Sequence, residues 1–328
     1  MTFSLRYRAL AALAVGATLL ISACGSDDSE DTAAASGSPA AAAGFPDKLV
    51  VAAVPAENSS DLKASYDPIL KLLEKETGAE IEFSQATDYA GVIEGMIAGN
   101  VDLALFGAFS YVIAGNNDAK MTPVGAVLSE KGATPGYYSY GFTKADNAAV
   151  TKIDDFKGKK TCFVDPGSTS GFLYPSAGLI EAKVIASGSE ADLAAGLTPT
   201  FAGAHDASVL GVKNGDCEVG FAEDSMVDTT LIEKGDLKEG ELKVVWKSGL
   251  IPAPVFAANN DLGADVISKL SSIVVEKANS DYLLSQNLCT GDCLLTDQDA
   301  WGFAAAKDAD YDPIREVCEA TKSDKCKG

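Results

Sequence analysis

Three hydroxyl side chains in a row, Ser168, Thr169 and Ser170, stand between two glycines in the stretch VDPGSTSGFLYP. A hydroxyl on such a turn can be the nucleophile of a hydrolase, whose G-x-S-x-G elbow exposes a serine between a strand and a helix. Here the central residue between Gly167 and Gly171 is Thr169. Neither serine therefore occupies the nucleophile position of that motif.

A hydrolase also needs a histidine and an acid. The chain has one histidine, His205. Because α/β-hydrolases order their triad as serine, acid and histidine, the acid would have to be Glu181, Glu190 or Asp192. A secreted serine hydrolase that uses one of the two serines remains the alternative from the enzyme class.

The same hydroxyl cluster can bind an anion. It lies where an expected strand at 159–165 ends and an expected helix at 171–184 begins. The first N–H groups of a helix lack partners within it, and the aligned peptide dipoles place about half a positive charge there. Such a terminus is an anion site. The alternative is an ordinary helix cap, which serine and threonine form commonly.

Strand and helix patterns alternate on both sides of this segment. The first series has strands at 49–55, 81–86 and 101–107 and helices at 67–78 and 89–100. The second has strands at 159–165, 197–203 and 217–223 and helices at 171–184 and 207–215. This order predicts an α/β fold with mainly parallel sheets and helices on both faces.

Two extended segments, 136–143 and 242–259, connect the two series and are rich in aromatic and β-branched residues. They predict two α/β lobes joined by two crossover strands. We assign residues 45–140 and 253–328 to lobe 1 and residues 141–252 to lobe 2. Hinge strands near 138–143 and 245–252 would absorb a closing motion of the lobes.

The N-terminus has the layout of a secretory signal. Arg6 and Arg8 precede an apolar run at 9–21 and the small residues before Cys24. A run of about 13 apolar residues falls short of the roughly 20 that span a membrane. We therefore expect a signal peptide at 1–23, a lipidated Cys24 and a flexible tether at 24–44, whose composition cannot bury enough surface to fold.

Seven cysteines become six once Cys24 is set aside. An even number in an exported chain suggests disulfides, of which six cysteines allow 15 arrangements. We favour two local pairs and one pair that joins two expected strands. A metal cluster is less favoured, because C-x3-C is not a usual zinc spacing. The expected pairs are Cys162 with Cys217, Cys289 with Cys293, and Cys318 with Cys326.

The charge of the chain limits its partners. Its 26 basic and 47 acidic side chains give a formal net charge of -21, which disfavours nucleic-acid binding. Removing Arg6 and Arg8 with the signal leaves one arginine, Arg315.

Five segments together resemble the phosphonate, phosphite and phosphate-binding proteins of bacterial ABC importers. They contain DYAG, PGYY, STSGF, AGAH and WKSGLIP, in the order of that family and across nearly the whole mature chain. The resemblance implies a periplasmic-binding-protein type 2 fold that holds a small phosphorus oxyanion between its lobes. It implies a substrate-binding protein and not an enzyme, without cofactor or metal, that delivers its ligand to a permease. With a lipidated Cys24, we expect a monomer anchored to the outside of the cytoplasmic membrane.

The resemblance also implies a ligand set. Hydroxyl and imidazole groups close round the oxyanion, and FGAFSY adds two weaker candidates. Taken alone, a tyrosine here could be a packing residue and the histidine a buried structural one. The implied ligand residues are Tyr89, Tyr137, Ser168, Thr169, Ser170 and His205, with Ser110 and Tyr111 as the weaker pair.

Relatives that take aminoalkylphosphonates carry acids that hold the amine. Here the alignment places Ser225 at the first acidic position, and LIPAPVF offers no acid at the second. We therefore expect phosphate, phosphite or a short alkylphosphonate in preference to 2-aminoethylphosphonate, although Glu223 and Asp224 lie just before Ser225. A ligand-sensing lipoprotein without a transport role remains a further alternative.

Overall fold

The structure is a computed structural model and describes residues 44–56 and 62–327. The expected signal peptide, Cys24 and nearly all of the expected tether lie outside the described residues. None of the helices in the described part of the chain is long and apolar enough to cross a membrane.

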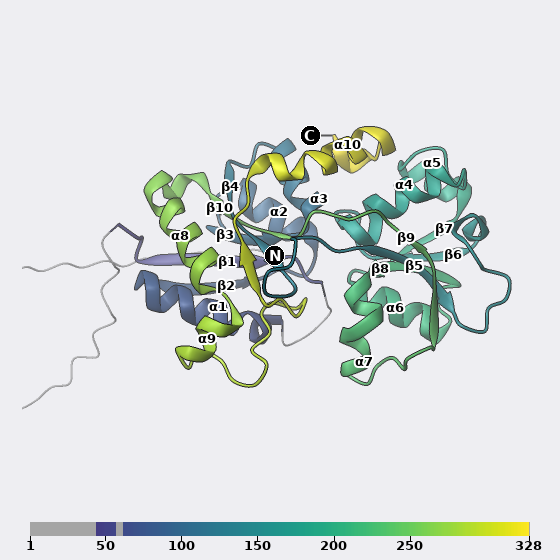
Figure 1. Cartoon of the computed structure of the whole chain (residues 1–328). Coiled ribbons are helices and arrows are strands. Elements are labelled where there is room, and N and C mark those ends of the chain that lie inside the picture. The colour runs from purple at the N-terminus through teal and green to yellow at the C-terminus, as the bar shows by residue number, and fades with distance from the viewer. Residues whose placement is uncertain (1–43, 57–61, 328) are drawn as a thin grey trace, which may run out of the picture. The chain divides into compact units, whose positions relative to one another are not determined.

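The first of two β-sheets has six strands in the order β11-β4-β10-β3-β1-β2 (Figure 1). β1 pairs in parallel with β2 and β3, whereas β10 lies antiparallel between β3 and β4, and β11 is antiparallel to β4. The strands are β1 Lys48–Ala53, β2 Glu80–Gln85, β3 Leu103–Phe106, β4 Met121–Leu128, β10 Val255–Asn259 and β11 Gly302–Ala304.

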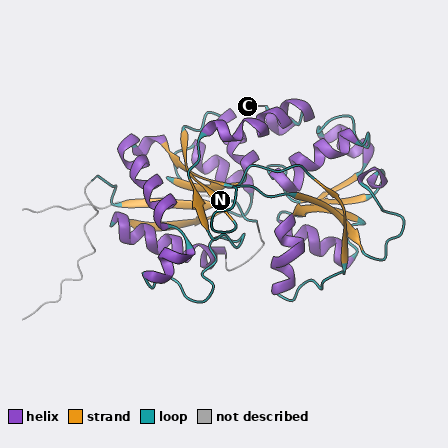
Figure 2. Cartoon of the chain, viewed as in Figure 1, coloured by secondary structure: helices purple, strands orange, loops and turns teal. Residues whose placement is uncertain are grey.

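The second sheet has five strands in the order β7-β6-β8-β5-β9, labelled in Figure 1 and drawn in orange in Figure 2. β6 is parallel to β7 and β8, and β5 is antiparallel to β8 and β9. The strands are β5 Ser139–Lys144, β6 Lys160–Phe163, β7 Thr198–Phe201, β8 Val219–Glu223 and β9 Leu242–Lys247. β5 thus begins two residues before the position where we divided the lobes.

The expectation of mainly parallel sheets was wrong, because antiparallel pairs outnumber parallel ones in the first sheet and equal them in the second. Parallel pairing needs a helical crossover. β5 and β10 are the first strands after the chain passes from one sheet to the other, and no helical crossover connects them to the strands beside them. Both therefore pair antiparallel with their neighbours. β10 follows β9 after a short extended segment.

Helices cover both faces of the first sheet, as expected. Side chains alternate across a strand, so Leu49 and Val51 of β1 join one buried cluster with α1 and α8, while Ala52 joins another with α2 and α3. These four helices are α1 Leu62–Thr77, α2 Tyr89–Ile97, α3 Ala108–Asn116 and α8 Ala264–Lys277. α1 starts five residues before the expected position and holds Pro68 inside it.

The remaining helical segments surround the second sheet and the C-terminus. In the second sheet they are η1 Ile153–Phe156, η2 Thr169–Leu173, α4 Tyr174–Glu181, α5 Glu190–Gly196, α6 His205–Asn214, η3 Met226–Thr230 and α7 Leu231–Glu233. Toward the C-terminus they are η4 Asn260–Leu262, α9 Ser280–Ser285, η5 Asp308–Tyr311, α10 Asp312–Thr321 and η6 Asp324–Cys326.

Three disulfides close the chain on itself, with the pairing given above. Cys162 of β6 is bonded to Cys217, which stands just before β8. The other two bonds are local, one after α9 and one between α10 and η6. Since β6 and β8 are neighbours in the second sheet, the first bond ties together the two strands that carry Ser168 and Glu223 at their ends.

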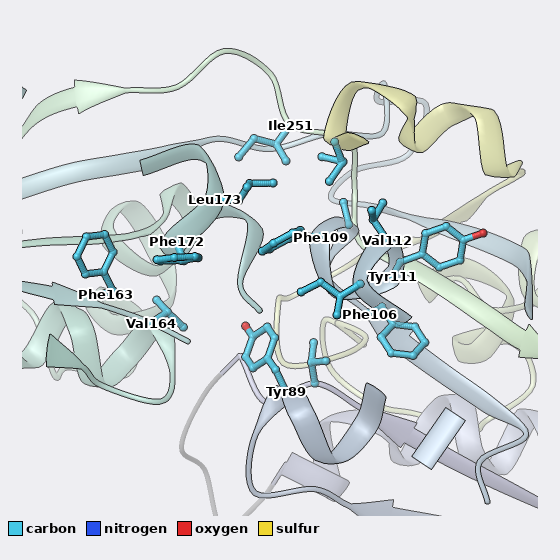
Figure 3. Close-up of a cluster of buried hydrophobic side chains, with 14 of the residues drawn as sticks. Tyr89, Phe106, Phe109, Tyr111, Val112, Phe163, Val164, Phe172, Leu173 and Ile251 are labelled. Atoms are coloured by element: carbon cyan, nitrogen blue, oxygen red, sulfur yellow. The ribbon is translucent and has the colours of Figure 1, made fainter. Parts of the chain in front are cut away.

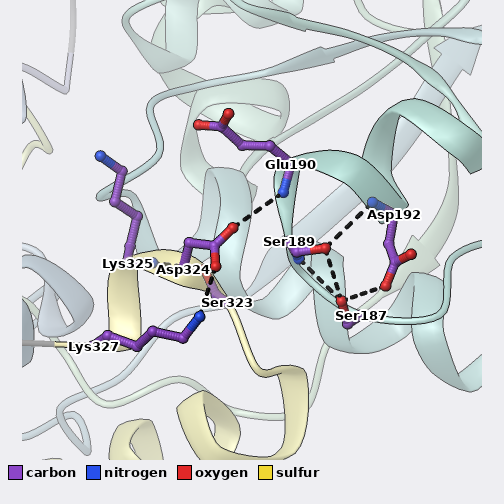
Figure 4. A network of polar contacts seen from close by, with 8 residues as sticks. All are labelled: Ser187, Ser189, Glu190, Asp192, Ser323, Asp324, Lys325 and Lys327. Atoms are coloured by element: carbon purple, nitrogen blue, oxygen red, sulfur yellow. Dashed lines mark hydrogen bonds and ion pairs between the residues drawn. The ribbon is translucent and has the colours of Figure 1, made fainter.

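The C-terminal segment contacts elements of both sheets. The N–H of Gly188, before α5, donates to the carbonyl of Thr321 (2.7 Å). Figure 4 shows a second contact, in which the N–H of Glu190 donates to Asp324 Oδ2 (3.4 Å). On the other side, Asn116 of α3 donates through Nδ2 to the carbonyl of Cys326 (3.2 Å). This segment therefore forms a third link between the lobes, beside the two crossovers.

Candidate functional site

The hydroxyl cluster lies at the end of β6, where the chain turns into η2. Ser168 caps this turn, because its Oγ accepts from the N–H of Gly171 (3.0 Å). The turn has the wide π form, with the N–H of Leu173 donating to the carbonyl of Ser168 (3.1 Å). The cap and the anion site are therefore compatible: a hydroxyl that accepts from the backbone still has its own proton to donate.

Thr169 connects the cluster to the first sheet. Its Oγ1 accepts from the N–H of Phe109 (2.9 Å), which lies in the first turn of α3 after β3. A Cβ on Gly107 would lie 3.2 Å from Thr169 Oγ1 and 3.4 Å from Ser110 Oγ. The absence of a side chain at Gly107 thus leaves a small space between these two hydroxyls.

Ser170 brings a buried hydroxyl into the same place. Its side chain is buried, and its Oγ has no hydrogen-bond partner among the residues that the structure describes. It lies near enough to the Tyr137 hydroxyl to lower the pKa of that group, against the larger rise caused by burial and by the charge of Glu223. An unpaired buried hydroxyl costs about 1 to 3 kcal/mol, which a bound acceptor would offset.

Tyr89, at the start of α2 in the first lobe (Figure 3), and His205, at the start of α6 in the second, complete the cluster. The Tyr89 hydroxyl lies 3.5 Å from His205 Nε2, and both residues are buried. Burial, then the charge of Glu223, raises the pKa of Tyr89 well above its usual value. Tyr89 therefore stays protonated and can donate.

His205 is neutral, and its tautomer follows from its partner. The N–H of Glu223 donates to Nδ1 (3.0 Å), so the ring proton must sit on Nε2, which faces Tyr89. Burial lowers the pKa of His205 to about 3. The imidazole is therefore a fixed, uncharged donor at neutral pH.

We expect the imidazole nitrogens of the free protein to show the Nε2–H tautomer unchanged between pH 8 and 5. The single histidine makes a long-range 15N–1H spectrum free of overlap. Because the unfolded chain takes up this proton near pH 6.5 and the folded protein only near 3, His205 withdraws stability as the pH falls through that window. A titration midpoint near 6.5 in the folded protein would contradict the assignment.

The two weaker candidates differ. Ser110 is buried beside the cluster and donates to the carbonyl of Gly107 (3.1 Å). Tyr111 is not brought into the cluster: its hydroxyl donates to Asp308 Oδ1 (2.8 Å), and in Figure 3 that hydroxyl points away from Tyr89. Helical geometry turns adjacent residues to different sides, so α3 presents one of this pair and not both.

Glu223 and Gln298 line a cavity of about 370 Å³ beside Tyr137. Neither of them was assigned to the ligand site from the sequence. Gln298 Nε2 donates to Glu223 Oε2 (2.9 Å). Glu223 ends β8, two residues before Ser225, the residue that the alignment had placed at the acidic position. The signal that could have found it is its position at the carboxyl end of a strand next to β6, where parallel α/β sheets bind ligands.

Arg315, the one arginine after the expected signal peptide, is not part of this cluster. Arg315 is paired with Asp308 and Asp312, each at 2.7 Å. In the described part of the chain, no three or more His, Cys, Asp or Glu side chains gather as a metal site.

Two mixed sheets, joined by β-crossovers and meeting at buried donors, define a type 2 periplasmic binding protein. Residues 51–311 match the family described as "ABC transporter, phosphonate, periplasmic substrate-binding protein". The chain belongs to this family, whose members are extracytoplasmic substrate-binding proteins of ABC importers.

Similar proteins agree with this membership. The chain is 57% identical to the "Phosphate-import protein PhnD" of Mycolicibacterium smegmatis, over 97% of this chain and 98% of that protein. A solved binding component of an ABC phosphonate transporter from Pseudomonas aeruginosa superposes with a TM-score of 0.71 at 25% identity, covering 85% of this chain and 87% of its own. PhnD1 of Prochlorococcus marinus, solved with methylphosphonate, shares the fold (TM-score 0.68, 21% identity, 84% and 99% covered).

Proposed function

We propose that this protein captures a small phosphorus oxyanion, phosphate in the first place, and delivers it to an ABC permease. The observation that carries the proposal is the convergence of uncharged donors from both sheets around the unpartnered hydroxyl of Ser170. Neutral hydroxyl and imidazole donors bind oxygens by number and geometry, and hydrogen bonds to a charged acceptor contribute about 1.5 to 3 kcal/mol each. The name of the M. smegmatis relative supports phosphate. The proposed donors are Tyr89, Tyr137, Ser168, Thr169, Ser170 and His205, with Ser110 beside them.

We infer that the site does no catalysis. In a serine hydrolase the histidine donates its Nδ1–H to an acid and accepts the serine proton at Nε2. In this chain Nδ1 accepts a hydrogen bond from the backbone N–H of Glu223 (3.0 Å), so the ring proton lies on Nε2, which cannot act as that base. Absence of ester turnover, with retained binding, is the result expected in an assay.

We also propose how the protein is anchored and where it lies in the cell. The signal and Cys24 make it a lipoprotein whose tether, residues 24–44, lets a monomer reach its permease from the outer surface of the cytoplasmic membrane. The lobe bounds given above describe the two parts that would close on the ligand. A sensor without a transport role would bind the same anion, and loss of uptake on deletion of the protein separates the two.

We expect phosphate, phosphite and methylphosphonate each to bind more tightly than 2-aminoethylphosphonate. An ammonium that enters a buried site loses its water and needs charged partners, and the acids beside the cavity are largely engaged: Asp224 accepts from the N–H of Tyr138 (3.2 Å) and Asp228 accepts from the Tyr140 hydroxyl (2.8 Å). Competitive calorimetry on the purified protein measures the order. If none of the four ligands binds, the proposed function itself fails.

A further inference from the structure

Glu223 is an acid placed among the donors of an anion site. It is the last residue of β8 and only 2% exposed. Its backbone holds the imidazole of His205, and its side chain lines the cavity beside Tyr137. Its charge, after burial, is the second cause that raises the pKa of both Tyr89 and Tyr137. The carboxylate therefore lies close to the groups that would hold the ligand.

A second residue fixes the direction of this carboxylate. Gln298 donates to it from a tight loop of the first sheet's lobe (2.9 Å). The neighbouring Asp297 anchors that loop, because its carboxylate accepts from the N–H of Ala56 (2.9 Å) and from the Tyr66 hydroxyl (2.8 Å). Gln298 is thus a positioning residue, held by one lobe and orienting an acid of the other.

A carboxylate and a fully ionised oxyanion cannot share such a site without repulsion, since both only accept hydrogen bonds. A ligand with a hydroxyl on phosphorus resolves the conflict by donating that proton to the carboxylate. We propose that Glu223 accepts the P–OH hydrogen bond of the ligand, so that the site selects a protonated oxyanion, hydrogenphosphate, and rejects sulfate. This inference rests on the proposed function and narrows its ligand.

The first test compares two ligands on the unaltered protein between pH 6 and 9. Methylphosphonate loses its only P–OH at its second ionisation, whereas phosphate keeps one throughout this range. Above that ionisation the affinity for methylphosphonate should fall about tenfold per pH unit, while the affinity for phosphate should not fall, because hydrogenphosphate keeps its P–OH. A methylphosphonate affinity that does not fall up to pH 9 overturns the proposal.

Titration of the protein's own side chains near Glu223 does not interfere with this test. The titratable side chains near Glu223 include those of Tyr66, Tyr89, Tyr137 and His205, and Asp224 and Asp228 line the same cavity. Burial raises the pKa of the three tyrosines and lowers that of His205 to about 3, so none of them changes charge between pH 6 and 9. Asp224, whose pKa burial raises, lines the same cavity and is tested directly below.

The second test measures phosphate and sulfate affinities for Glu223→Gln. A site built to bond a substrate hydroxyl rejects an analogue without it by about 10⁴-fold, and that preference is expected in the unaltered protein. An amide can donate to sulfate, so the preference should shrink at least about 100-fold in the variant. The matched control is Asp224→Asn, which removes a neighbouring charge on the same cavity and should leave the ratio within about threefold.

Each outcome separates this inference from the function beneath it. An unchanged phosphate-to-sulfate ratio in Glu223→Gln, or an equal change in Asp224→Asn, overturns the role of Glu223 while phosphate binding stands. Tighter binding of 2-aminoethylphosphonate than of phosphate overturns it too, because the carboxylate would then hold an ammonium. Failure of the unaltered protein to bind any of these anions refutes the proposed function instead.

Discussion

Thr169→Ala is expected to weaken phosphate binding about ten- to 150-fold. Thr169 Oγ1 accepts from the N–H of Phe109 across the lobes (2.9 Å), which directs its own proton toward the proposed ligand. Alanine removes both the donor to a charged oxygen, at about 1.5 to 3 kcal/mol, and the acceptor that joins the two lobes at Phe109. Isothermal calorimetry with phosphate measures the loss.

The matched control for this change is Thr169→Ser, which keeps the hydroxyl and removes a methyl group. It should retain phosphate affinity to within about tenfold. An alanine variant with unaltered affinity and an unaltered melting temperature would reduce the hydroxyl of Thr169 to a structural contact.

Gly171→Ala is expected to damage both the fold and the site. A Cβ at this position would lie 2.3 Å from Val164 Cβ and 2.8 Å from Ser168 Oγ. Val164 cannot yield easily, because its Cβ is tied to the backbone that leaves β6. Overpacking of this kind costs about 1 to 3 kcal/mol or more, and relief of the clash would displace the Ser168 cap. The melting temperature should fall by at least about 2 °C, with phosphate affinity lowered as well.

Gly249→Ala provides the comparison for this prediction. No atom lies within 4 Å of a Cβ at Gly249, and the residue is exposed. Its effect on stability should stay within about 0.5 kcal/mol. Thermal unfolding of both variants, each with and without phosphate, gives the two measurements. Equal melting temperatures for Gly171→Ala and the unaltered protein would show that β6 and η2 tolerate the extra methyl group.

The hydroxyl cluster could be proposed from local sequence, whereas Tyr89, Tyr137 and His205 were implied by the resemblance to the binding-protein family. Ser168, Thr169 and Ser170 lie together because they are adjacent, and a strand-to-helix turn between glycines has few possible shapes. Tyr89 and His205 each begin a helix, α2 and α6, and helix starts are the best marked points of an α/β chain.

The acid of the site could not be placed in the same way. One residue of shift along a strand turns a side chain to the opposite face, so an alignment alone could not choose among Glu223, Asp224 and Ser225. Its partner Gln298 lies 75 positions further along the chain, on a loop with no local signature. Contacts of this kind depend on the packing of the two lobes, which no local pattern encodes.

The sheet orders also escaped prediction, for a related reason. β4 is followed along the chain by β5 and not by a helix, so the alternation of strand and helix does not predict its neighbours. β10 pairs with β3 and β4, which lie far away in the sequence. Local periodicity identifies strands but not their neighbours. The third link, formed by residues 312–326 between the lobes, has the same origin, since its partners lie near Asn116 and Gly188.

The central place of β10 determines the order in which an exported chain can complete itself. β10 lies between β3 and β4 and is the strand that joins them into one sheet. It follows all five strands of the second sheet along the chain. The second sheet is one continuous stretch of chain, so it can fold while the first still has a gap at its centre. Pairings between such distant residues form slowly. The half of the molecule synthesised first is therefore the half that closes last, and the facing edges of β3 and β4 stay unpaired until β10 is in place.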